Sequence, residues 1–196
     1  MGHEGGRNAR SVLRRSSIAT GYVALGLLAL TLLTGPANLL LDRRNPVSSY
    51  LRRDAGTWTA IFSVVHVILG LQVHGTGKIS GFLDYFIARD GGVLRNSFGL
   101  ANYTGLVGVV IVLGLLAISS DAALRKLKAR PWKRLQRLNY ALFVLVILHA
   151  IFYGALLRMT SAYTVLLVIT AAVVFIAQAI GVRLWRRRYS NGSQVA

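Results

Sequence analysis

Five long stretches of the chain carry no aspartate, glutamate, lysine or arginine. Each has at least 18 residues, so as a helix each can cross a hydrocarbon layer of about 30 Å. Together they occupy more than half of the 196 residues. The pattern predicts an all-α protein, an integral membrane bundle of five transmembrane helices. The predicted spans are Ile18–Leu41, Gly56–Val73, Phe98–Ser119, Leu138–Leu157 and Ala162–Val182.

The spans divide the chain into an N-terminal tail over residues 1–16, a transmembrane domain over residues 17–185 and a basic tail over residues 186–196. The first apolar run follows an arginine pair, as in a signal peptide. It is longer than most signal-peptide cores and continues beyond Pro36. We therefore expect a retained first span, with a kink at Pro36 near its end.

The segment between the second and third spans has apolar residues at helical spacing, followed by Gly91 and Gly92. This pattern predicts a short amphipathic helix lying in the membrane interface, which the two glycines end. An ordinary connecting helix is the alternative. The apolar positions are Ile79, Phe82, Leu83, Phe86 and Ile87.

The net charge of +17 is concentrated at the ends of the spans. Of the 23 lysines and arginines, 15 fall on the side that holds the C-terminus and 8 on the other. Positive charge gathers on the cytoplasmic side of membrane proteins, so we expect the N-terminus outside and the C-terminus in the cytoplasm of a multi-pass bacterial inner-membrane protein. Because these charges meet lipid headgroups, we expect no nucleic-acid partner.

The third loop, over residues 120–137, is the most basic of the connections. It has helical character, and Pro131 is expected to break the helix, with Trp132 at headgroup level. The loop is an anchor on the positive side. Docking of an acidic soluble partner is an additional hypothesis.

Several chemistries are disfavoured by what the sequence lacks. Without cysteine there are no disulfides, iron–sulfur clusters or thiolate haem ligands. No glycine-rich nucleotide-binding motif is present. No span contains a carboxylate, which argues against an ion-coupled transporter.

Two histidines lie deep inside uncharged spans. His66 is the twelfth residue after Asp54, and His149 is the twelfth after Arg137. At about 1.5 Å per residue each histidine is roughly 18 Å from its charged flank, near the middle of a bilayer. Two histidines at one depth on helices that run the same way favour the axial ligands of one haem iron. Zinc would require more ligands than this depth offers.

The alternative is a haem-free structural or assembly protein whose histidines donate hydrogen bonds between helices. Glycines near the histidines suit a haem slot, although small residues also serve close helix packing. These glycines are Gly70, Gly105, Gly108 and Gly114.

Three further residues are candidates at the outer ends of the spans. His74 lies eight residues, roughly 12 Å, beyond His66 and about 80° around the helix, so it cannot ligate the same haem. It is a candidate for a second site, as a ligand of a second haem, a contact for a quinone headgroup or a contact for an outer partner. A solvated interfacial histidine is the alternative. Arg95 and Arg158 are candidates for contacts with haem propionates.

Three segments carry a resemblance to a known family: Thr31–Pro36 (TLLTGP), Arg52–Trp58 (RRDAGTW) leading to His66, and Arg130–Tyr140 (RPWKRLQRLNY) leading to His149. They resemble the ferric reductase-like transmembrane domain. Within that family the chain looks like the haem-binding membrane subunit of the bacterial periplasmic methionine sulfoxide reductase system.

The resemblance implies a membrane cytochrome with haem b, an electron-transfer subunit of an oxidoreductase, with His66 and His149 as ligands of the haem iron. It implies a separate electron donor, either quinol or a flavoprotein reductase, and an external acceptor such as a periplasmic oxidoreductase. A second, inner haem would need ligands where this chain has Arg53 and Gln136. We therefore expect one haem per chain.

Overall fold

Five long helices dominate the computed structural model, which describes residues 2–42, 47–74, 81–154 and 161–192. Their lengths and apolar character suit membrane crossing. The fourth candidate span, Arg130–Phe152, joins a short basic helix, α5, to the apolar α6. The predicted all-helical bundle with five spans is confirmed. The long helices are α1 (Gly2–Leu40), α2 (Val47–His74), α3 (Ser97–Ala117), α6 (Leu138–Phe152) and α7 (Ala162–Gly192).

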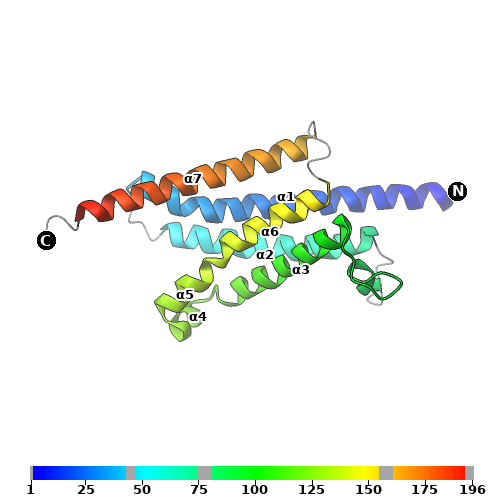
Figure 1. The fold of residues 1–196 in the computed structure, drawn as a ribbon, viewed down its shortest axis with the longest axis horizontal. Helices are drawn as coiled ribbons and strands as arrows, with labels where there is room; N and C mark the ends of the chain where they lie inside the picture. Colours follow the sequence, from blue (N-terminus) through cyan, green and yellow to red (C-terminus); the bar gives the residue numbers. More distant parts are fainter. Residues whose placement is uncertain (1, 43–46, 75–80, 155–160, 193–196) are drawn as a thin grey trace.

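Successive spans alternate in direction, so the two chain termini lie at opposite ends of the bundle (Figure 1). The C-terminal end of α7 shares one end with α4 (Asp121–Leu127) and α5 (Ala129–Gln136). We call this the basic end, because it gathers the arginine-rich connections. Two ion pairs, each at 3.0 Å, lie there: Arg53 with Asp121, and Arg188 with Asp42.

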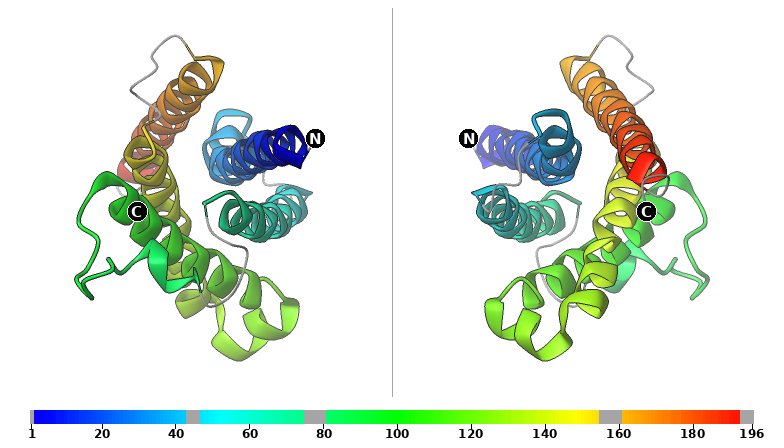
Figure 2. Two further views of the ribbon diagram at one scale, coloured as in Figure 1. Left: turned by 90° about the vertical axis from the view of Figure 1, so that its right-hand side faces the viewer. Right: turned by 90° about the vertical axis from the view of Figure 1, so that its left-hand side faces the viewer.

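The helices pack as neighbouring pairs, which the end-on views separate clearly (Figure 2). Helix α1 packs along α2, and α3 packs along α6. Helix α7 packs against α1, where the Gln178 side-chain amide donates a hydrogen bond of 2.7 Å to the carbonyl of Leu32. Gly181 lets α7 approach the ring of Pro36, since a Cβ there would lie 3.2 Å from it. The two histidine-bearing helices thus belong to different pairs.

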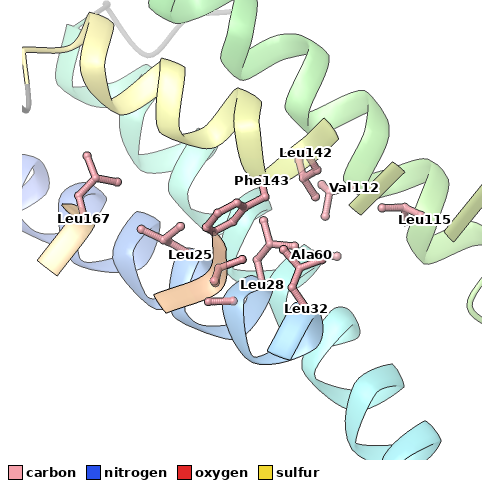
Figure 3. Packing of buried hydrophobic residues seen from close by; sticks show 11 residues of the cluster. Leu25, Leu28, Leu32, Ala60, Val112, Leu115, Leu142, Phe143 and Leu167 are labelled. Atoms are coloured by element: carbon pink, nitrogen blue, oxygen red, sulfur yellow. The ribbon is translucent and has the colours of Figure 1, made fainter. Parts of the chain in front are cut away.

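All five long helices contribute to one apolar core (Figure 3). Its largest fully buried side chain is Phe143 of α6. Large apolar side chains also point outward along the spans, as at Val110, which is 63% exposed. In a bilayer such side chains face lipid. Labelled core members are Leu25, Leu28, Leu32, Ala60, Val112, Leu115, Leu142, Phe143 and Leu167.

The prediction of an interfacial helix over residues 79–89 is wrong for the part that the structure describes, which begins at Gly81. This part holds a 3-10 helix, η2 (Leu83–Tyr85), and a turn closed by an antiparallel bridge between Ile87 and Val93. Side chains of α3 explain the difference. Asn102 donates to the carbonyl of Tyr85, and Tyr103 donates to the carbonyl of Phe86, which also accepts from the N–H of Leu94 across the turn. These bonds hold the backbone of this segment against α3 in a turn.

Two other helix ends differ from the sequence-based expectations. The basic loop breaks at Lys128, where φ is 61°, and not at Pro131. Pro131 sits in the first turn of α5, where a missing N–H breaks no intrahelical bond. Helix α6 ends at Phe152 instead of continuing to residue 157, and Gly154 follows with φ of 82°. Residues 155–157 lie outside the described range.

Candidate paired-histidine site

His66 of α2 and His149 of α6 meet inside the bundle. Their ring centroids are 6.0 Å apart and their planes cross at 80°. Both helices start from the basic end, and the equal spacing of each histidine from its charged flank brings the two rings to one depth. The two side chains therefore meet as the spacing predicts, and their role as ligands stays a prediction.

Each histidine is fixed by a backbone carbonyl of the helix packed beside it. The distance from Nδ1 of His66 to the carbonyl oxygen of Ser17 is 2.7 Å, and from Nδ1 of His149 to that of Ala101 it is 2.8 Å. A carbonyl oxygen can only accept, so Nδ1 carries the proton in both rings. In the neutral imidazole, Nε2 then keeps a free lone pair. This is the tautomer of a histidine that binds metal through Nε2.

Two glycines make room for the imidazole rings. A Cβ atom at Gly21 of α1 would lie 3.0 Å from Nδ1 and Cε1 of His66. A Cβ atom at Gly105 of α3 would lie 2.8 Å from Nδ1 of His149. A larger residue at Gly105 would force the ring of His149 to move, and one at Gly21 would push the ring of His66 by a few tenths of an ångström. These glycines therefore accommodate the candidate ligands themselves.

The other glycines singled out from the sequence have less specific surroundings. A Cβ at Gly108 would make ordinary contact with Leu142 at 3.6 Å, and one at Gly70 would lie 3.7 Å from Oγ of Ser17. A Cβ at Gly114 would meet nothing within 4 Å. Of the four, Gly105 alone closely contacts a histidine, and it is joined by Gly21, which the sequence did not single out.

A hydrogen-bonded network lies on the side of the histidines away from the basic end. The hydroxyl of Tyr153 donates to Oδ1 of Asn102 at 2.6 Å, and the amide of Asn102 donates to the carbonyl of Tyr85 at 3.2 Å. The hydroxyl of Tyr85 in turn donates to the carbonyl of Leu71 at 2.9 Å. Burial raises the pKa of Tyr85, and neighbouring Asp84 adds to this, so its hydroxyl remains a donor. The network ties α2, α3 and α6 together beside the histidines.

Sequence reasoning missed this network, although one signal was present. Tyr153 follows His149 by four residues, so both side chains lie on one face of the helix. In the structure the two rings are 5.0 Å apart and edge-on. The tyrosine therefore covers one side of the histidine and limits its movement.

None of the three further candidates, His74, Arg95 and Arg158, is placed at the histidine pair in the part of the chain that the structure describes. His74 is the last residue of α2, and its side chain lies outside what the structure describes, as does Arg158. Arg95 is exposed in the segment just before α3. Their suggested roles stay predictions.

The pair fits the ligand set of a haem iron better than that of a zinc site. Two imidazoles on opposite sides of one metal ion, bound at about 2 Å, have centroids about 6 Å apart. Among the described residues, no group of three or more histidine, cysteine, aspartate or glutamate side chains could hold a metal ion. Haem iron needs only these two protein ligands, because the macrocycle supplies the others.

The fold and the site together define a polytopic helical membrane protein with a paired-histidine centre in its interior. The sequence matches the family described as the ferric reductase like transmembrane component over residues 20–147, a range that includes His66 and ends just before His149. The match covers more than half of the chain, and the protein belongs to this family. Membership indicates a role in membrane electron transfer. No curated protein and no solved structure matches the chain.

Proposed function

We propose that this protein is a b-type cytochrome of the bacterial inner membrane, with His66 and His149 as the axial ligands of one haem. One observation carries the proposal: both rings donate from Nδ1 to a carbonyl, which leaves the Nε2 lone pair available on two imidazoles whose centroids are 6.0 Å apart. Family membership supports it independently.

In this proposal the bound haem supplies reversible one-electron chemistry at its iron. The protein supplies position and environment. The carbonyls of Ser17 and Ala101 hold each imidazole in the ligating tautomer and raise its basicity. The apolar spans exclude water from the centre, and Tyr153 restrains the ring of His149 from the side away from the basic end.

The electron donor and acceptor are separate partners in this proposal. Quinol or a cytosolic flavoprotein donates electrons, and an external acceptor, such as a periplasmic oxidoreductase, receives them. The chain then works as the haem-binding membrane subunit of the bacterial periplasmic methionine sulfoxide reductase system does. The basic end faces the cytoplasm, as the positive-inside rule predicts.

A soluble donor would dock on the basic end. Four exposed cationic residues of α4, α5 and their junction present a positive surface there, which attracts an acidic partner. We call them the docking quartet. They are Lys126, Lys128, Lys133 and Arg134.

One observation favours a second candidate function. Hydrogen bonds from both histidines to neighbouring helices are what a haem-free structural or assembly protein would use to join its helices. In that case only Nδ1 matters, and Nε2 has no role. The two functions therefore differ in which ring nitrogen they require.

Asparagine separates the two functions, because its side-chain amide can replace the Nδ1–H donor but has nothing in the position of Nε2. We expect purified His66→Asn and His149→Asn to insert and keep near-native thermal stability while losing the absorption spectrum of a low-spin haem. His66→Ala and His149→Ala serve as controls that lose both donor and ligand. Full haem content in both asparagine variants would refute ligation. A wild-type protein without haem would favour the structural alternative.

A further inference from the structure

A second feature lies nearer the basic end, where the helices line a partly open cavity of about 370 Å³. This volume is within the range of small-molecule sites, roughly 300–1,000 Å³. Helices α1, α2, α3, α5 and α6 all contribute to its wall. Its apolar part consists of Leu28, Val112, Leu115 and Leu116, and its polar part includes Thr31, Thr34, Asn38, Arg52, Arg53, Thr59, Trp132, Gln136 and Asn139.

Two residues of the cavity wall, Arg53 and Gln136, stand at the same distance along the chain from the two histidines. His66 is the thirteenth residue after Arg53, and His149 is the thirteenth after Gln136. The structure brings Arg53 and Gln136 to one cavity. It likewise brings the two histidines together, farther along the same two spans from the basic end. Among the described residues that line this cavity there is no histidine, methionine or cysteine. Its wall therefore lacks the usual ligands of a second haem.

The wall instead offers hydrogen-bond donors beside apolar surface. Nε of Arg52 is buried and makes no hydrogen bond to the described residues. Leaving a charged donor in this state is unfavourable, so the cavity favours a ligand that brings an acceptor oxygen. Arg53 is already engaged, by Asp121 at 3.0 Å and by the ring of Tyr50 at 5.5 Å. The unpartnered donor thus belongs to Arg52.

The remaining polar groups add to this selectivity. The amide of Asn139 donates to the backbone carbonyl of Gln136 at 3.0 Å and to its side-chain Oε1 at 3.3 Å. The Gln136 side chain lines the cavity, and its amide nitrogen can only donate. The hydroxyls of Thr31 and Thr59 donate to carbonyls of their own helices, so only their lone pairs face a ligand. A ring with carbonyl or hydroxyl oxygens on an apolar body matches this wall.

We propose that this cavity binds the headgroup of a quinone, with a ring oxygen accepting from Arg52 and the ring against the apolar wall. The proposal rests on the proposed function, in which such a molecule is one candidate donor. Oxidation of a quinol breaks two O–H bonds and releases two electrons and two protons. A single haem held by His66 and His149 would take one electron at a time, and the external acceptor would reoxidise it between the two transfers. The protons leave to water beside Asp121, which lines the cavity and is exposed.

The distance to the histidine pair suits this role. Thr59 lines the cavity and precedes His66 by seven residues on one helix. The separation along the axis is therefore about 10 Å. A ring bound here lies between the basic end and the candidate haem, and no described residue of the cavity wall is a histidine that could bind iron.

A larger side chain in place of Gly56 should fill the cavity. It lines the wall, and a Cβ atom there would meet nothing within 4 Å, so a larger side chain extends into open space without a backbone clash. Gly114 has the same freedom but does not line the cavity, which makes Gly114→Leu the matched control for Gly56→Leu. Arg52→Gln removes the free donor, and Arg130→Gln removes an exposed arginine of α5 outside the wall.

Trp132 lines the cavity and reports on its contents. We would replace Trp58 and Trp185 by phenylalanine, place the protein in nanodiscs of zwitterionic lipid, and titrate decylubiquinone while measuring Trp132 fluorescence. We expect saturable quenching that Gly56→Leu abolishes and Gly114→Leu preserves. Arg52→Gln should weaken binding by about tenfold or more, the usual effect of losing a hydrogen bond to a charged group. Arg130→Gln should leave it unchanged.

Equal quenching in Gly56→Leu and Gly114→Leu, or none that saturates, would overturn the proposal. Loss of quenching when the nanodisc lipid is changed to an anionic one would assign the cavity to a lipid headgroup, which also overturns it. The haem spectrum of the same samples is read separately. Quinone binding without haem refutes the proposed function alone, and haem without quinone binding refutes this inference alone.

Discussion

Replacing Gly105 by alanine tests the site through a single added methyl group. That carbon would lie 2.8 Å from Nδ1 and 2.9 Å from Cε1 of His149, closer than real contacts of this kind. The ring has little freedom to move, because Tyr153 lies 5.0 Å away on one side and His66 6.0 Å away on the other. The methyl group should therefore push the imidazole off the carbonyl of Ala101.

The expected magnitude combines three contributions. Overpacking in a filled interior destabilises by about 1–3 kcal/mol. Loss of the hydrogen bond to Ala101 adds about 0.5–1.5 kcal/mol. The better helix propensity of alanine offsets at most about 1 kcal/mol. The net effect is a loss of roughly 0.5–4 kcal/mol in the free energy of unfolding, together with a misplaced ligand and reduced haem content.

The same helix supplies the controls. Gly114→Ala adds its methyl group to open space and should be neutral or slightly stabilising, and Gly108→Ala makes only an ordinary contact with Leu142 at 3.6 Å. Thermal unfolding in detergent and the haem absorbance per protein should be measured for all three variants. If Gly105→Ala behaves like Gly114→Ala in both measurements, the assigned packing of His149 is wrong.

Other parts of the chain give three more predictions. His74→Ala should leave most of the haem in place, since His74 lies eight residues beyond His66; two haems per chain, one lost in this variant, would make it a ligand. Burial, and then Asp84, raise the pKa of Tyr85 above its usual value of 10.0, so the stability that its hydroxyl contributes should be complete below that pH and disappear as the pH rises through the raised pKa. The melting difference between wild type and Tyr85→Phe should shrink over that window, and a constant difference contradicts the assignment. Neutralising the docking quartet should slow haem reduction by a soluble flavoprotein, and increasing salt should slow it in the wild type; stopped-flow rates that are equal and independent of salt would leave that loop as an anchor only.

The spans and the shared depth of the histidines could be predicted because helical rise is constant. Uncharged runs give each crossing, and equal counts from Asp54 to His66 and from Arg137 to His149 give equal depth. The spans and the shared depth do not depend on how the helices pack, so periodicity along the chain was sufficient for both. The approach of the two rings to 6.0 Å also depends on how the helix pairs pack, which the spacing alone does not determine.

The partners of the histidines could not be predicted, because they are backbone atoms. Every residue has a carbonyl, so nothing in the identities of Ser17 and Ala101 marks them as acceptors. Gly21 was missed for a related reason, since its close approach to His66 depends on how α1 packs on α2. The segment over 81–96 differed because side chains of α3 bind its carbonyls, which local apolar spacing does not reveal.

The two pairs of helices have a consequence for the order of assembly. His66 and its acceptor Ser17 both belong to the α1–α2 pair, whereas His149 and its acceptor Ala101 both belong to the α3–α6 pair. Each helix pair therefore contains both the donor and the acceptor that hold its own histidine, so neither half of the centre depends on the other for its hydrogen bond. In the proposed cytochrome, assembly of the centre then requires only that the two pairs dock side by side in the plane of the membrane.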